Sequence, residues 1–66
     1  MSNHPVRLTK ADTVALWHAV DDMAIMVKEV RKDPTFSAEI KEAAEVRLRA
    51  ARQALVKVNK IRRAQP

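Results

Sequence analysis

The sequence predicts an all-α protein: an antiparallel hairpin of two long helices that dimerises into a four-helix bundle. The chain has 66 residues and no Gly, and its prolines at positions 5, 34 and 66 leave two uninterrupted helix-length segments. Within each segment, apolar residues recur at steps of three and four, which is typical of an amphipathic helix. A lone chain of this size buries only roughly 60% of its unfolded surface, so we expect a partner.

The first helix is expected over residues 10–32. Thr9 and Asp12 have the spacing of a capping box, in which each side chain accepts a hydrogen bond from the other residue's backbone N–H. The sequence Lys32-Asp33-Pro34 ends the helix, because proline has no N–H and pushes the preceding residue out of the α region. The apolar positions form a heptad-like seam: Leu16, Val20, Met23, Val27 and Val30.

The second helix is expected over residues 38–63, with Ser37 as its N-cap. Its apolar positions are Ile40, Ala44, Leu48, Ala51, Leu55 and Val58. Helices joined by about five residues are antiparallel neighbours. The domain organisation is therefore a flexible N-terminal arm over residues 1–8, followed by one hairpin domain over residues 9–64.

Apolar residues of the first helix extend beyond its seam, and one partner helix cannot cover them all. We therefore expect a homodimer, with a dimer or protein-binding interface formed by Val14, Trp17, Ala24, Ile25 and Met26. In a second interpretation, Trp17 packs over the core of its own hairpin, and the other residues are ordinary exposed apolar side chains. A complex with a different protein is the third interpretation.

Charge is distributed unevenly along a chain of net charge +5: all eight acidic residues precede position 46, and seven of the thirteen basic residues follow it. We expect a basic face on the second helix formed by Arg49, Arg52, Lys60 and Arg63. This face would meet an acidic protein surface, a nucleic-acid phosphate backbone or only solvent. Arg47 is placed near the apolar side and is a candidate for a buried or interfacial ion pair with Asp22.

Catalytic and metal-binding patterns are weak. His18, Asp21 and Asp22 are close in sequence, but a structural metal site needs four ligands, and no Ser or Cys nucleophile lies nearby. We expect no enzyme activity, no cofactor, no metal and no small-molecule substrate. Apolar runs are too short to span a membrane, and the chain has no Cys, so a cytoplasmic location is expected.

The predicted function is a non-enzymatic protein-binding module, an inhibitor or adaptor that occupies the functional surface of another protein. The first alternative is a nucleic-acid-associated protein that uses the basic face, although no stacking aromatic residues lie among its cations. The second alternative is a structural subunit of a larger assembly.

Overall fold

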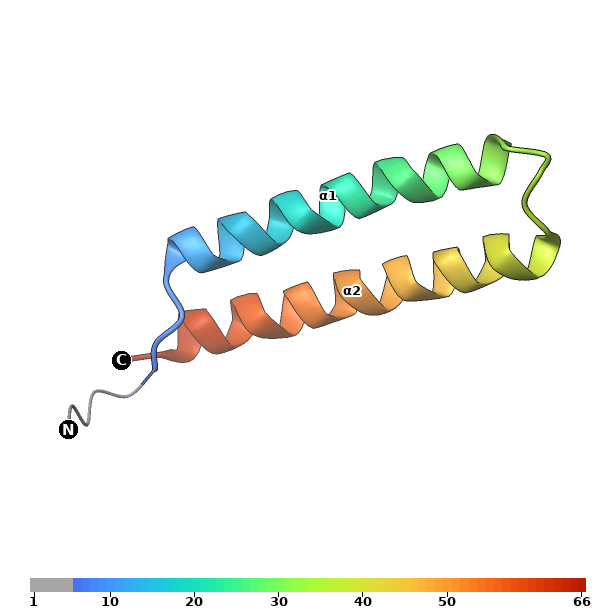
Figure 1. Ribbon diagram of the computed structural model, residues 1–66. Coiled ribbons are helices and arrows are strands. Elements are labelled where there is room, and N and C mark those ends of the chain that lie inside the picture. Colours follow the sequence, from blue (N-terminus) through green and yellow to red (C-terminus); the bar gives the residue numbers. More distant parts are fainter. Residues whose placement is uncertain (1–5) are drawn as a thin grey trace.

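Two antiparallel helices make up the fold of the computed structural model, which describes residues 6–66 (Figure 1). Helix α1 spans Lys10–Lys32 and helix α2 spans Ala38–Ala64, and the two pack side by side along their length. Residues 33–37 connect them at one end of the hairpin. The predicted hairpin is confirmed, and the bounds of both helices agree with the expected ones to within one residue.

Both helices begin at the predicted caps. The Asp12 N–H donates to Thr9 Oγ1 at 3.2 Å, and the Thr9 N–H donates to Asp12 Oδ2 at 2.8 Å, so the capping box is complete. At the start of α2, the Ile40 N–H donates to Ser37 Oγ at 3.2 Å. These bonds satisfy backbone donors that a helix leaves unpaired in its first turn.

The turn is organised by Asp33. Its carboxylate Oδ1 accepts hydrogen bonds from the Thr35 N–H at 2.9 Å and from Thr35 Oγ1 at 2.6 Å, while its own N–H donates to the Glu29 carbonyl at 3.1 Å. The bonds from the side chain and the backbone of Thr35 lower the pKa of Asp33 because they stabilise its charged form. Bonds from the backbone and the side chain of Thr9 lower the pKa of Asp12 in the same way.

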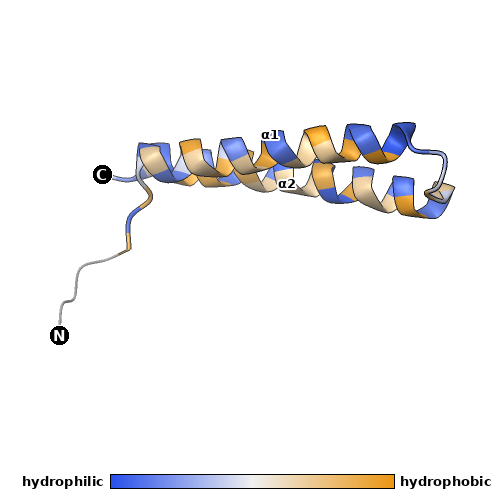
Figure 2. Cartoon of the chain, turned by 45° about the horizontal axis from the view of Figure 1, so that its top comes forward, coloured by the Kyte–Doolittle hydropathy of each residue, from blue (hydrophilic) through white to orange (hydrophobic). Residues whose placement is uncertain are grey.

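The buried core of the single chain is small. Val27 and Leu48 are the buried apolar side chains among the described residues, and Thr13 is buried with its Oγ1 donating to the Lys10 carbonyl at 2.8 Å. Leu16 and Met23, which the sequence places in the seam between the helices, are exposed. The side of α1 that faces α2 is instead centred on Thr13, Val20 and Val27, which are spaced by seven residues and are buried or half-buried. Hydrophobic residues therefore also lie outside the helix contact (Figure 2).

The open end of the hairpin is held by side-chain hydrogen bonds. The Leu8 N–H donates to Gln65 Oε1 at 2.8 Å, and Gln65 Nε2 donates to the Leu8 carbonyl at 2.7 Å. Arg7 Nη2 donates to the Pro66 carbonyl. Residues 1–5 of the expected arm lie outside the described residues. Arg7 and Leu8, which the sequence assigns to the arm, are tied to the end of α2.

Across residues 6–66, neither helix has an apolar stretch long enough to cross a lipid bilayer.

Candidate functional site

An open groove runs along one side of the contact between α1 and α2. It consists of two hollows, of about 540 and 340 Å³, and Arg52 lines both. Residues spaced by three and four share one side of a helix, so each helix contributes one row of side chains. The rows, which together define the groove, are Trp17, Asp21, Ala24, Lys28 and Arg31 on α1, and Glu45, Arg49, Arg52, Val56 and Asn59 on α2.

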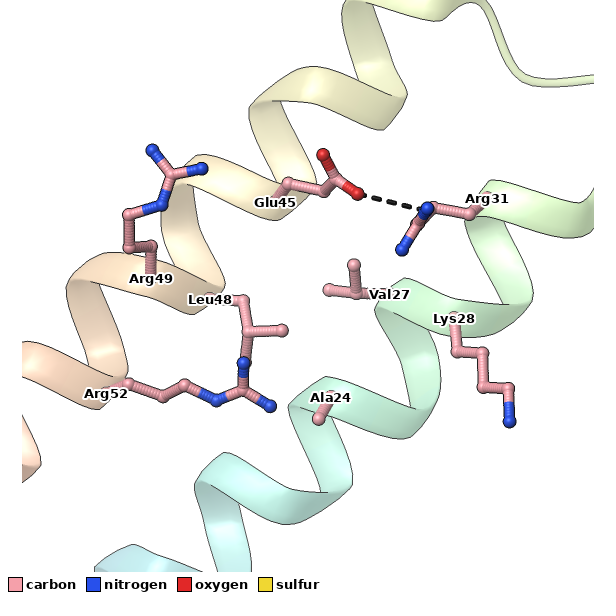
Figure 3. A pocket seen from close by; sticks show the side chains of 8 residues that line it. All are labelled: Ala24, Val27, Lys28, Arg31, Glu45, Leu48, Arg49 and Arg52. Carbon is pink, nitrogen blue, oxygen red and sulfur yellow. Dashed lines mark ion pairs between the residues drawn. The ribbon is translucent and has the colours of Figure 1, made fainter.

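The larger hollow lies nearer the turn and is crossed by an ion pair. Arg31 Nε lies 2.9 Å from Glu45 Oε1, with side-chain exposures of 64% and 40% (Figure 3). A pair this exposed is screened by solvent and contributes less than about 1 kcal/mol to stability. Below the pair, Val27 and Leu48 form the floor of the hollow. The pair thus marks which residues of the two helices lie at the same level.

The smaller hollow lies nearer the chain ends and is bordered by the tryptophan. Trp17 is 59% exposed, and Val56 on the facing helix is 67% exposed. Val20 and Leu55 line the same hollow and are half-buried. The smaller hollow therefore combines a large exposed aromatic side chain with apolar neighbours, residue types that are common at the centres of protein interfaces.

The groove has a positive balance of charge. Glu45 is paired with Arg31, which leaves Asp21 as the one unpaired acid against Lys28, Arg49 and Arg52 among the groove residues. Arg52 reaches toward the facing helix, whereas Lys28 and Arg49 extend outward at the rims (Figure 3). An acidic surface that enters the groove would meet these cations at the rim and Trp17 at one end.

The predicted interface residues do not share one face. Trp17 and Ala24 line the groove, whereas Val14, Ile25 and Met26 are exposed elsewhere on α1. By helical spacing, Met26 lies on the opposite side of the hairpin from Trp17, and Val14 and Ile25 lie toward the outside of α1. Trp17 is not folded over a closed core, because most of its surface remains accessible.

The predicted basic face is divided in a similar way. Arg49 and Arg52 line the groove, whereas Lys60 and Arg63 are exposed and do not line it. The structure does not bring the fifth cation considered, Arg47, to its predicted partner.

Arg47 and Asp22 are both exposed in the single chain. The ion pair within residues 6–66 joins Arg31 to Glu45 instead. Sequence reasoning missed this pair, although counting outward from the turn would have placed the two residues at the same level of the antiparallel hairpin.

His18 is exposed, and within residues 6–66 no three His, Cys, Asp or Glu side chains gather in a metal-binding arrangement. His4 lies outside the described residues. Both hollows of the groove are partly open to solvent.

Comparison of the chain with protein-family models, with curated proteins and with solved structures gives no match.

Proposed function

We propose that this protein is a non-enzymatic, cytoplasmic protein-binding module, an inhibitor or adaptor whose groove covers an acidic surface of another protein. The observation that carries the proposal is the exposed Trp17 beside a groove rimmed by Lys28, Arg49 and Arg52. Tryptophan and arginine are enriched at the energetic centres of protein interfaces. Cations at the rim attract an acidic partner and raise its association rate.

The proposal includes a homodimer in which two hairpins form a four-helix bundle. The single chain buries few apolar side chains for a protein that is 47% hydrophobic, and several large ones are more than a third exposed. A second hairpin would remove much of this apolar surface from water, which is the main favourable term in association.

A titration monitored by Trp17 fluorescence tests the groove, since Trp17 is the only tryptophan in the chain. The probes are a synthetic peptide with leucines among glutamates and a mixed-sequence DNA duplex, each at low and high salt. We expect saturable binding of the peptide. The double variant Arg49→Glu/Arg52→Glu should weaken it at least about tenfold, because both rim charges reverse.

The matched control is Lys57→Glu/Lys60→Glu, which changes net charge equally at residues that do not line the groove. It should change peptide affinity by less than about threefold. Steeply salt-dependent DNA binding, with equal losses in both double variants, would overturn the proposal in favour of a phosphate-binding face over the whole of α2.

A further inference from the structure

A second surface, the apolar face, lies on the opposite side of the hairpin from the groove. Helical spacing assigns one row of side chains to it from each helix. Several of its large side chains are exposed, including Met26 at 67% and Ile40 at 51%. The rows are Leu16, Ala19, Met23, Met26 and Val30 on α1, and Ile40, Ala44, Arg47, Ala51, Ala54 and Val58 on α2.

We propose that the apolar face binds a second copy of this chain about a two-fold axis parallel to the helices, and that Arg47 pairs there with Glu29 of the partner subunit. This inference rests on the dimer proposed above and specifies its face, its symmetry and its polar contact. The groove stays open to solvent in this dimer, because it lies on the far side of each hairpin.

The apolar stripe of each helix supports a second neighbour on this side. The heptad positions of α1, such as Leu16 and Met23, lie on the edge of the apolar face that is next to the contact with α2, and not on the contact itself. The stripe of α2 is displaced toward the same side, as exposed Ile40 shows. Both helices therefore present apolar side chains on the same side of the hairpin. Half of a four-helix bundle requires such an arrangement.

The shape of the apolar face is complementary to itself. In the middle of the face, the α1 row contains the large side chains Met23 and Met26, whereas the α2 row at the same level contains Ala51 and Ala54. A two-fold axis parallel to the helices places the α1 row of each copy over the α2 row of the other. In the middle of the face, large side chains then fill the space above small ones, and every neighbouring pair of helices is antiparallel.

The register of the hairpin determines which residues meet across this axis. Facing positions on α1 and α2 have residue numbers that add up to about 76, as those of Arg31 and Glu45 do. A rotation about an axis parallel to the helices keeps each residue at its level. Met23 therefore lies level with the space between Ala51 and Ala54 of the partner subunit.

The same register rule places a basic residue of one copy at the level of an acidic residue of the other. Arg47 is the charged residue in the middle of the apolar face, whose rows reach Asp12 and Arg62 only near the chain ends, and residue 29, at its level, is Glu29. Glu29 is exposed, and the ion pair within residues 6–66 does not involve it. Arg47 points toward α1 of the other copy, where Glu29 of the partner subunit borders the apolar face. The dimer contains this pair twice, once for each subunit.

The area is sufficient for a stable dimer. Helix α1 is about 35 Å long, and two helices side by side are about 20 Å wide, so the face offers roughly 700 Å² per copy. Specific interfaces bury about 800 Å² per partner, and those of homodimers are more apolar than the surrounding surface.

Analytical ultracentrifugation over a concentration series tests the proposal with the full chain. The wild type should sediment as a dimer. Arg47→Glu and Glu29→Arg should each weaken the dimer at least about tenfold, because like charges then meet twice in the interface. The double variant Arg47→Glu/Glu29→Arg should return to within about threefold of wild type, which a variant that fails to fold cannot do.

Lys57→Glu is the matched control, since it reverses a charge outside both the groove and the apolar face and should leave the dimer intact. A monomeric wild type, an equal effect of Lys57→Glu, or no recovery in the double variant would overturn the proposal. The variant Arg49→Glu/Arg52→Glu should still dimerise. Loss of peptide binding with an intact dimer, or the reverse, therefore separates failure of the groove from failure of the apolar face.

Discussion

Truncation of Leu48 tests the packing between α1 and α2. Leu48 is 9% exposed and packs beside Val27 at the floor of the groove. Leu48→Ala removes three carbon atoms, which at about 0.8 kcal/mol per buried methylene is about 2.4 kcal/mol of lost transfer free energy. Measured Leu→Ala costs run from about 2 to 5 kcal/mol, depending on the cavity left behind. Since water from the open groove can enter the vacated space, we expect about 2–3 kcal/mol.

Urea unfolding, followed by far-ultraviolet circular dichroism at fixed protein concentration, measures this loss. With a slope of about 1 kcal/mol per M for a small protein, the urea midpoint should fall by about 2–3 M. The control is Val46→Ala, at a side chain that is 53% exposed and lies outside the helix contact. It should change the free energy of unfolding by less than about 0.5 kcal/mol. Equal losses in the two variants would refute the packing of the helices described above.

Three further changes concern the ends of the helices. Thr9→Ala should lower the free energy of unfolding by about 1 kcal/mol, measured by urea unfolding, because it removes half of the capping box. The pKa values of Asp12 and Asp33 are lower in the folded state, so their contribution to stability is present above pH about 4 and is lost as the pH falls through the folded-state values. Urea midpoints measured against pH should show this loss, and Asp12→Asn should reduce it. Gln65→Ala should speed amide exchange at Leu8 about fivefold by NMR, the equivalent of a hydrogen bond of about 1 kcal/mol, whereas Gln53→Ala should not.

The bounds of the helices were predictable because their signals are local. Thr9 and Ser37 cap helices through bonds that span three residues, and Pro34 ends the first helix by its own covalent structure. These effects need no knowledge of the rest of the chain. The two-helix hairpin then follows from a connection too short for any other arrangement.

The orientation of each helix about its own axis was harder to predict. Periodicity specifies a stripe about 100° wide, but not which edge of the stripe faces the other helix of the same chain. The sequence therefore placed Leu16 and Met23 in the helix contact, whereas the structure leaves both exposed and buries Thr13. When hydrophobicity alone is used to locate the helix contact, large apolar residues on one edge of the stripe count for more than small residues at its centre.

The contacts made by polar side chains depended on register, which composition does not give. Arg31 meets Glu45 because the length of the turn sets the level of each residue, and Gln65 meets Leu8 for the same reason at the other end. The groove around Trp17 and Arg52 was only partly predictable: both residues were candidates, but nothing in the sequence showed that they border the same hollow.

The two hydrogen bonds between Gln65 and Leu8 have a consequence for slippage between the helices. The apolar positions of α2 repeat by heptads, so sliding one helix past the other by seven residues would again bring apolar side chains together. The turn opposes such a slide at one end, and the Gln65 amide opposes it at the other, since both bonds to the Leu8 backbone would break. The Gln65 side chain thus helps to select one register among the several that the heptad repeat of α2 would allow.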